Sequence, residues 1–282
     1  MNIKKLLIFA SNLLRKIGID SYEIDAKIIL QQIMSWDRLT LELNKEQNID
    51  LSACKEFFFL LRRRLAFEPI AYITNKKEFY GLDFFVKDCL IPRPDTECIV
   101  EYCIKNLAHK KEPLVLDICT GSGCIGLSIA YFVNDSKVVL SDINKKSLET
   151  AKKNADNLCL SKKTEFLLGD LFEPFSNIKA DLIVSNPPYI SNKEMLDLSI
   201  DIYDYEPHKA LFSYDESGIY FYEKIIKQAS KYMKPDAILV MEIGYSQEIL
   251  IENIAKSYFD NIHFFKDLAN NTRGVVLNKI KG

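Results

Sequence analysis

Hydrophobic residues recur at three- and four-residue steps along the first part of the chain, which is the spacing of one helix face. The first run begins at Ile3 and stops at Gly18, because glycine commonly ends a helix. Ser21 and Asp50 are placed to cap two further helices, since short polar side chains accept hydrogen bonds from the unpaired N–H groups at a helix start. We therefore predict a small helical-bundle domain over residues 1–75.

Three consecutive arginines, Arg62 to Arg64, lie within the third predicted helix. A run of like charges on a helix is usually a solvated face. A phosphate-binding patch is the alternative interpretation, and the solvated face is favoured over it.

After this domain the pattern changes. Residues 76–92 alternate between apolar and polar positions, which predicts a hairpin or linker that joins two domains. Pro92 and Pro94 then make a rigid, extended entry to the next helix. Asp95 or Thr96 is expected to cap that helix.

From Leu114 onward, short apolar runs alternate with amphipathic stretches, which indicates strands connected by helices. We predict strands near residues 114–119, 137–141, 164–168, 180–185, 237–243, 261–265 and 274–280. Helices are expected near residues 96–107, 123–133, 145–157, 217–233 and 246–258. Apolar strands of this kind form a mostly parallel sheet covered by helices on both faces. The second domain, residues 93–282, is therefore α/β and should bind ligands beyond the carboxyl ends of its strands.

A glycine-rich turn follows the first predicted strand of this domain. Gly121 and Gly123 allow the backbone to turn tightly and to approach a ligand closely. Asp142 ends the next strand, where a carboxylate can accept hydrogen bonds from both hydroxyls of a ribose. Asp170 and Leu171 follow the third strand and can contact the amino group and the face of an adenine ring. The spacing predicts a site for an adenine nucleoside.

A dinucleotide-binding dehydrogenase is the competing interpretation, because Gly121, Gly123 and Gly126 also satisfy the G-x-G-x-x-G spacing. Asp117, at the end of the first strand, argues against it. A carboxylate there is badly placed beside a pyrophosphate but well placed beside a cation. S-adenosylmethionine carries a sulfonium and an ammonium and no phosphate, so a methyltransferase is favoured. A simpler role for Asp117, as a hydrogen-bonded acid at a strand end, stays open.

The most informative motif is Asn186-Pro187-Pro188-Tyr189, called the NPPY loop below, which follows the apolar residues 181–184. Its prolines remove two backbone N–H groups and stiffen the chain. The loop offers carbonyl oxygens, an asparagine amide and an aromatic face. Two acceptors can take both hydrogens of a planar NH2 group while the tyrosine stacks on its plane. An ordinary proline-rich turn is the less favoured interpretation.

Composition narrows the choice further. The formal net charge of the 282 residues is −2, so no global field attracts nucleic acid. Seven cysteines form no C-x-x-C pair, and three histidines offer no zinc spacing, so we predict no metal site. Reduced cysteines and a cytoplasmic location are expected. No apolar run approaches the length of a membrane-spanning helix, and no membrane partner is predicted.

Together these motifs resemble the class I, S-adenosylmethionine-dependent amino methyltransferases. Upstream elements narrow the resemblance to the release-factor glutamine methyltransferases, the HemK/PrmC family. The elements are Glu68-Pro69-Ile70-Ala71-Tyr72, Lys77-Glu78-Phe79-Tyr80, and residues 90–97. Further matches are Glu206-Pro207, Ala210-Leu211, Glu242 with Gly244, and Asp267-Leu268 with Arg273. The resemblance spans essentially the whole chain, and residues 91–97 are its most specific part.

The resemblance implies a Rossmann-like, seven-stranded class I methyltransferase domain behind a small helical domain that recognises a protein substrate. The methyl donor would be S-adenosylmethionine and the product S-adenosylhomocysteine. The substrate would be the glutamine of the Gly-Gly-Gln motif of class 1 peptide chain release factors. The cofactor residues would be Asp117, Cys119, Thr120, Gly121, Ser122, Gly123, Asp142, Asp170, Leu171 and Asn186. Asn186, Pro187 and Tyr189 would be catalytic, and the NPPY loop, including Pro188, would bind the substrate amide.

Three residues depart from the family pattern. Asn75 and Asn270 stand where a glycine is expected, and Asn tolerates the left-handed backbone. Cys119 stands where a small residue is usual, which bears on the packing of the cofactor. Two alternatives stay open: an adenine N6 or guanine N2 methyltransferase acting on nucleic acid, and a binding-only fold. The acidic balance of the chain and the intact glycine and asparagine motifs disfavour them, and no direct nucleic-acid substrate is expected.

Overall fold

A computed structural model describes residues 2–281, and the contacts within them divide the chain into two units. The first unit extends up to Lys76 and also includes Ser199–Tyr205. The second comprises Lys77–Leu198 and the chain from Glu206 onward. Most of the predicted linker, residues 76–92, therefore groups with the second unit. No helix within residues 2–281 is long and apolar enough to cross a membrane.

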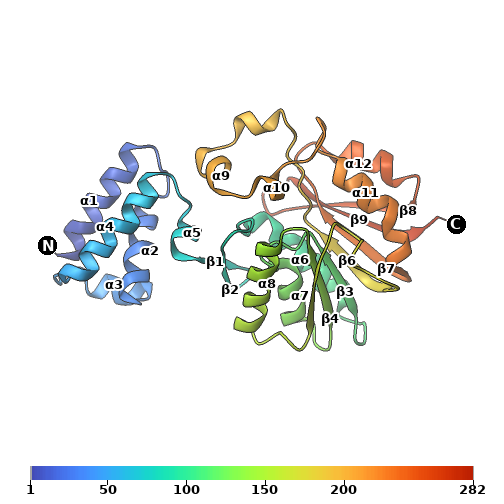
Figure 1. Cartoon of the computed structure of the whole chain (residues 1–282), viewed down its shortest axis with the longest axis horizontal. Helices are drawn as coiled ribbons and strands as arrows, with labels where there is room; N and C mark the ends of the chain where they lie inside the picture. Colours follow the sequence, from blue (N-terminus) through green and yellow to red (C-terminus); the bar gives the residue numbers. More distant parts are fainter. Residues whose placement is uncertain (1, 282) are drawn as a thin grey trace. The chain divides into compact units, whose positions relative to one another are not determined.

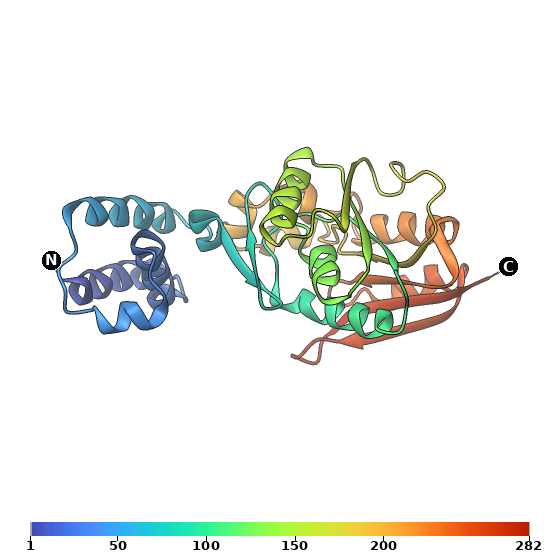
Figure 2. The same cartoon turned by 90° about the horizontal axis from the view of Figure 1, so that it is seen from below.

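The first unit is a helical bundle in which α1 (Ile3–Lys16), α2 (Tyr22–Met34) and α4 (Leu51–Leu65) lie side by side (Figures 1 and 2). Two short helices, α3 (Arg38–Leu43) and α5 (Ile70–Thr74), were not predicted. Asp50 caps α4 as predicted, accepting a hydrogen bond from the N–H of Ala53 over 2.9 Å. Ser21 stands at the cap position of α2 as predicted, but it makes no capping hydrogen bond, because its hydroxyl donates to Asp25 instead.

The arginine run is a solvated face only in part, because Arg62 is exposed but the two arginines after it form ion pairs. Arg64 is 7% exposed and its Nε donates to the buried Asp25 over 2.7 Å. Arg63 forms a two-pronged pair with Glu68 over 2.8 and 2.5 Å. The helix period explains the error, because Arg64 follows the buried Phe57 by seven residues and therefore shares its inward face.

The second unit begins with a hairpin of β1 (Lys76–Phe79) and β2 (Leu82–Phe85). Its two turn residues, Tyr80 and Gly81, have φ of 51° and 74°. Left-handed geometry at both positions is typical of the turn that matches the twist of a hairpin. The predicted hairpin is therefore present.

Within residues 2–281, the large sheet has seven strands in the order β5-β4-β3-β6-β7-β9-β8. The strands are β3 (Leu114–Ile118), β4 (Lys137–Asp142), β5 (Thr164–Leu168), β6 (Ala180–Ser185), β7 (Met233–Glu242), β8 (Phe259–Lys266) and β9 (Thr272–Ile280). Strands β3 to β7 pair in parallel, and β9 is antiparallel to both of its neighbours. Every predicted strand is present.

Helices cover both faces of this sheet (Figure 1). On one face, α6 (Glu97–Leu107), α7 (Cys124–Phe132) and α8 (Lys145–Asn157) contact one another and the strands. On the other, α11 (Tyr220–Ala229) and α12 (Glu248–Ala255) share a buried cluster with Leu116, Ile183 and Leu239. The predicted two-sided α/β layering is confirmed.

The chain reverses its direction of travel across the sheet between β3 and β6. These strands pair with Ile118 opposite Ser185, and the Ser185 hydroxyl donates to the Ile118 carbonyl over 2.7 Å. Ligands of open α/β sheets bind at such a switch point. The glycine-rich loop and the NPPY loop therefore leave adjacent strands at this point.

Candidate functional site

The glycine-rich loop, residues 119–123, turns the chain from β3 into α7. The Thr120 hydroxyl and the Gly126 N–H both donate to Asp117 Oδ2, over 2.5 and 2.9 Å. Asp117 is buried, and its Oδ1 has no hydrogen-bond partner among residues 2–281. Burial raises the pKa of Asp117 to about 7, although both hydrogen bonds oppose the change. Asp117 thus fastens the loop to the start of α7, which agrees with the simpler role left open for it.

This close approach requires a glycine at position 126. A Cβ there would lie 2.7 Å from Asp117 Oδ2 and 3.1 Å from Leu140 Cδ2. We expect Gly126→Ala to lower the free energy of unfolding by about 1–3 kcal/mol, as overpacking usually does, and to weaken ligand binding by moving the loop. Denaturant unfolding measures the first effect.

Ser128→Ala on the same helix is the control for that substitution. The Ser128 hydroxyl is buried and has no hydrogen-bond partner within the described chain. Its removal should therefore be neutral or stabilising. Equal stability of Gly126→Ala and Ser128→Ala would contradict the close packing.

Asp142, at the end of β4, holds the other side of the loop. Its Oδ2 accepts from the Gly121 N–H over 2.9 Å, and its Oδ1 accepts from the Asn144 N–H over 2.8 Å. Burial raises the pKa of Asp142, and these backbone hydrogen bonds act against the rise. Each carboxylate oxygen keeps a further lone pair. Both oxygens can therefore accept one more hydrogen bond from a ligand.

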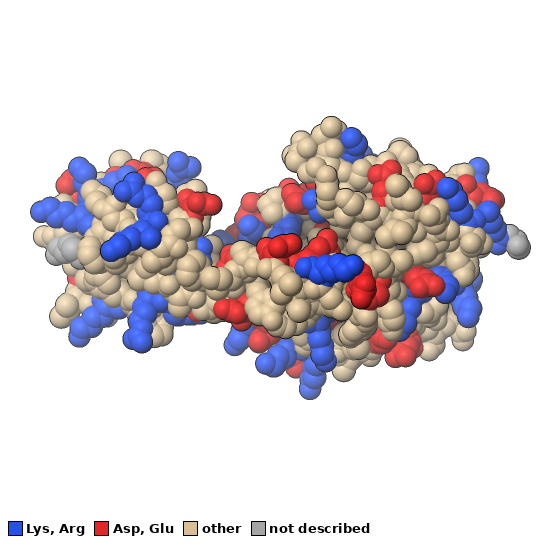
Figure 3. Space-filling model, turned by 90° about the horizontal axis from the view of Figure 1, so that it is seen from above, with Lys and Arg blue, Asp and Glu red and all other residues tan. Residues whose placement is uncertain are grey.

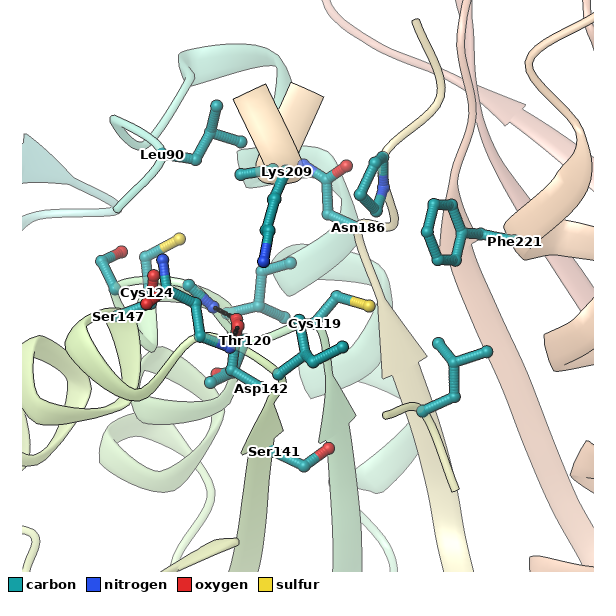
Figure 4. A pocket seen from close by; sticks show the side chains of 18 of the residues that line it. Leu90, Cys119, Thr120, Cys124, Ser141, Asp142, Ser147, Asn186, Lys209 and Phe221 are labelled. Atoms are coloured by element: carbon teal, nitrogen blue, oxygen red, sulfur yellow. Dashed lines mark hydrogen bonds between the residues drawn. The ribbon is translucent and has the colours of Figure 1, made fainter. Parts of the chain in front are cut away.

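A cavity of about 1190 Å³, including the solvent at its mouth, opens beside these loops. Figure 4 shows Thr120, Asp142 and Cys119 at its base, with Asn186 and Phe221 on one side and Leu90, Cys124 and Ser147 on the other. Lys209, on α10 (His208–Leu211), points into it. The whole wall belongs to the second unit. The size suits a ligand as large as a nucleoside with a side chain.

Most of the predicted site residues meet in this wall: Cys119, Thr120, Gly121, Ser122, Asp142, Asp170, Leu171, Asn186 and Pro188. Within residues 2–281, four predicted residues do not line it, namely Asp117, Gly123, Pro187 and Tyr189. Asp117 and Gly123 support the glycine-rich loop instead. Gly123 has a φ of 81°, and a Cβ there would lie 2.9 Å from Leu127.

The wall also contains residues for which the sequence predicted no part in ligand binding. They are mainly Leu90, Pro92 and Thr96 before α6, and Lys209, Tyr214 and Phe221 after β6. Leu90, Pro92 and Thr96 belong to residues 90–97, which carried the family resemblance, whereas Lys209, Tyr214 and Phe221 carried no signal.

The proline segment, residues 90–97, forms part of the wall because its polar side chains are fastened to distant elements. The N–H of Ile91 donates to Glu206 over 3.1 Å, and Arg93 pairs with the same carboxylate. The Thr96 hydroxyl donates to Glu242 over 2.5 Å, and Asp95 pairs with Arg273 over 3.0 Å.

The prediction that Asp95 or Thr96 caps α6 is therefore wrong. Thr96 stands at the cap position but makes no capping hydrogen bond from its side chain. A short 3-10 turn, Pro94–Thr96, precedes the helix instead. Both side chains instead contact strands of the sheet, Thr96 at the end of β7 and Asp95 at the start of β9.

Glu242 joins the proline segment to the NPPY loop. One carboxylate oxygen accepts from Thr96, and the other lies 3.5 Å from the Tyr189 hydroxyl. Burial raises the pKa of Tyr189, and the nearby charge of Glu242 adds to the rise. The ring of Tyr189 also packs against the buried cluster of α11 and α12. Tyr189 is therefore held in place by its ring and its hydroxyl together.

Glu242 should make the stability of the protein depend on pH. Burial raises its pKa from 4.5 to about 7, against the hydrogen bond from Thr96 and the charge of Arg273. A group with a raised folded-state pKa stabilises the fold fully below its unfolded pKa, and this stability is lost as the pH rises through its folded pKa. At about 1.4 kcal/mol per pKa unit, the loss is on the order of 3 kcal/mol.

We expect Glu242→Gln to reduce the fall in unfolding free energy between about pH 5 and pH 8, while Asp117, whose pKa is also raised to about 7, keeps its own share of that fall. Denaturant unfolding at several pH values measures this slope. Glu248→Gln, the same change at an exposed position, should keep the wild-type slope. If wild type and both variants show the same dependence of unfolding free energy on pH, Glu242 is not its source.

The residues present fit S-adenosylmethionine. Asp142 offers two acceptors for ribose hydroxyls, and Leu171 with Asp170 offers an apolar surface and an acceptor. A Cβ added at Gly121 would meet no described atom within 4 Å, so the backbone faces open space. Among residues 2–281, no group of three or more potential ligand side chains could hold a metal ion.

Comparison with known proteins agrees with the fold. The profile described as the PrmC N-terminal domain matches residues 5–74, and that of the methyltransferase small domain matches residues 100–202. A release factor glutamine methyltransferase from Clostridium acetobutylicum is 39% identical over 280 residues, which cover 98% of each chain. One from Leptospira interrogans is 37% identical and covers 99% of this chain and 98% of its own.

Other relatives are longer or more distant. A bifunctional methyltransferase from Rickettsia typhi is 36% identical, and the match covers 99% of this chain but 58% of that protein. The crystal structure of a methyltransferase from Pyrococcus furiosus has a TM-score of 0.51 at 18% identity, and covers 82% of this chain and 99% of its own. The predicted class I methyltransferase fold with an N-terminal helical domain is thereby confirmed. By its similarity to full-length relatives, the chain belongs to the family of release factor glutamine methyltransferases.

Proposed function

We propose that this enzyme transfers a methyl group from S-adenosylmethionine to the side-chain nitrogen of the glutamine in the Gly-Gly-Gln motif of class 1 release factors. One observation supports this most strongly. Asn186, which begins the NPPY loop, lines the same cavity as Asp142 and the glycine-rich loop. A group that binds an amide therefore stands beside a site that suits the methyl donor.

The donor would be held mainly by the backbone of the glycine-rich loop and by Asp142. Asp142 would accept hydrogen bonds from the ribose, and Asp170 with Leu171 would contact the adenine. Asp117 keeps the loop in shape through Thr120 and Gly126. When bound, S-adenosylmethionine supplies a methyl group on a sulfonium, which is a good leaving group.

The chemical difficulty lies with the acceptor, because the lone pair of an amide nitrogen is delocalised into its carbonyl. The NPPY loop addresses this by alignment. Asn186 Oδ1 and the Pro187 carbonyl each accept one amide hydrogen, which directs the nitrogen toward the methyl carbon. These acceptors also stabilise the positive charge that develops on the nitrogen. In favourable intramolecular reactions, alignment alone contributes roughly 7–11 kcal/mol.

Tyr189 is proposed to stack on the plane of the amide. Its ring is fixed by the buried cluster and by Glu242, so little freedom is lost when the substrate arrives. In this reaction no histidine or cysteine acts as a base, because the acceptor is neutral and its excess proton can pass to solvent after transfer.

A protein substrate also suits the surface. On the face of the second unit in Figure 3, acidic and basic side chains are interspersed. A methyltransferase that acts on nucleic acid is expected to present a basic surface near its site. The first unit, which matches the PrmC N-terminal domain, is proposed to contact the release factor.

Transfer of a labelled methyl group from S-adenosylmethionine tests this function. A purified release factor should accept the label, and a release factor whose motif glutamine is replaced by alanine should not. Ribosomal RNA and DNA serve as competing acceptors in the same assay. Label in nucleic acid, and none in the release factor, would overturn the proposed substrate.

A further inference from the structure

We propose that Gln247 is a positioning residue that clamps the backbone of the NPPY loop at Tyr189 and so holds Asn186, which lines the cavity, in one arrangement. The inference rests on the proposed function only for its effect on catalysis. Gln247 does not line the cavity in the described chain. It acts through the loop and not on the substrate.

The side chain of Gln247 is bonded to three separate stretches of backbone. Its Nε2 donates to the carbonyl of Tyr189 over 3.1 Å and to that of Gly218 over 3.2 Å, with the Ser217 carbonyl at 3.4 Å. Its Oε1 accepts from the N–H of Gly244 over 2.9 Å. The residue is 6% exposed. A buried amide that uses both ends on backbone groups fixes those groups relative to one another.

Two glycines make room for this clamp. A Cβ at Gly218 would lie 2.3 Å from the Tyr189 carbonyl oxygen and 2.4 Å from Gln247 Nε2. A Cβ at Gly244 would lie 2.8 Å both from Gln247 Oε1 and from Tyr189 Cδ2. Any side chain at either position would push Gln247 away from the loop.

The clamp completes the restraint of a loop that is already stiff. At its start, the Ser185 hydroxyl fastens β6 to the Ile118 carbonyl. In its middle, Pro187 and Pro188 each have a fixed φ. At its end, Gln247 holds the Tyr189 carbonyl. With both ends fixed, the Asn186 side chain and the Pro187 carbonyl keep one arrangement before the substrate enters.

Gln247→Glu is the sharpest test, because it is nearly isosteric. The variant keeps the acceptor for the Gly244 N–H but sets an oxygen against the carbonyls of Tyr189 and Gly218. We expect kcat to fall by about a hundredfold, as misplacement of a reacting group by about 1 Å can do. The dissociation constant of S-adenosylmethionine should change by less than about twofold, since the clamp does not touch the cofactor wall. Gln228→Glu, the same change on α11, is the matched control.

The pH dependence of kcat distinguishes a positioning role of Gln247 from a role in the stability of the fold. Protonation of the introduced carboxylate in Gln247→Glu would restore one donor, so kcat of the variant should recover in part as the pH falls, while that of wild type does not. Gly244→Ala is a second disturbance, whose Cβ would press on both Gln247 and Tyr189, and it should also lower kcat at unchanged cofactor affinity. It keeps the test available if Gln247→Glu fails to fold. Folded variants that turn over at the wild-type kcat would overturn the inference.

Hydrogen exchange separates failure of this inference from failure of the proposed function. The amides of Asn186, Tyr189 and Ile190 should exchange faster in Gln247→Glu and in Gly244→Ala than in wild type, with no methyl acceptor present. If exchange is faster in the variants but the wild-type enzyme does not methylate release factors, the clamp is supported and the proposed substrate is refuted. Unchanged exchange in both variants would refute the clamp, whatever the substrate.

Discussion

Replacing Asn186 by alanine is expected to lower kcat by about 10²–10³-fold, the usual effect of removing one preorganised polar group from an active site. The reason is geometric. Asn186 directly follows β6 and lines the cavity beside the glycine-rich loop. Without its Oδ1, one amide hydrogen of the substrate loses its acceptor and the nitrogen is free to turn away from the methyl carbon.

Single-turnover kinetics with saturating cofactor measure this effect, and calorimetry measures cofactor affinity. Affinity should change much less than kcat, because Asp142 and the glycine-rich loop are untouched. Asn192→Ala is the control, since Asn192 is exposed and lies shortly after the same loop. An Asn186→Ala enzyme with the wild-type kcat would remove the basis of the mechanism.

The second large effect is expected for Asp142→Asn, which should weaken S-adenosylmethionine binding by about a hundredfold. Both oxygens of Asp142 accept backbone N–H groups, from Gly121 and from Asn144. An asparagine must turn its NH2 toward one of them, so a partly buried donor loses its partner, at a cost of about 1–3 kcal/mol. The ribose also loses a charged acceptor.

Titration calorimetry with S-adenosylmethionine and with S-adenosylhomocysteine measures this loss. Both ligands carry the same ribose, so both should weaken by the same factor. Asp135→Asn is the control, because Asp135 is exposed and its φ of 57° suits asparagine. Unchanged affinity in Asp142→Asn would mean that the ribose does not bind at this carboxylate.

The sheet could be predicted because its signals are local. Strands β3 and β6 are short apolar runs buried on both faces, and their predicted ends differ from the observed ends by no more than one residue. Asp50 was identified as a cap because capping depends on the three residues that follow it. By contrast, α3 and α5 have six and five residues, which is too short for a helical period to be recognised.

The polar contacts that shape the site could not be predicted, because they join residues far apart in the sequence. Thr96 bonds to Glu242, 146 residues away, and Ile91 bonds to Glu206, 115 residues away. Local rules assigned Thr96 to a helix cap, and the tertiary contact overrides that preference. Gln247 carried no signal at all, because a buried glutamine is recognised only when its backbone partners are known.

The loop motifs were predicted only in part. Gly121, Asp142 and Asn186 were selected for chemistry expected at strand ends, and the sheet brings them to one cavity. Asp117 was selected for its charge, yet its contacts are those of a support for the glycine-rich loop. Residue type and strand position therefore predict which loops form the site. Which residue of a loop lines the cavity and which one supports the loop depends on its three-dimensional contacts.

Mass spectrometry of a release factor after incubation with the enzyme and S-adenosylmethionine tests the central claim most directly. The peptide that contains the Gly-Gly-Gln motif should gain the mass of one methyl group, and fragmentation should place that group on the glutamine side chain. The gain should be absent with Asn186→Ala on the same timescale. An unmodified glutamine, with methyl transfer to another residue or to nucleic acid, would contradict the account.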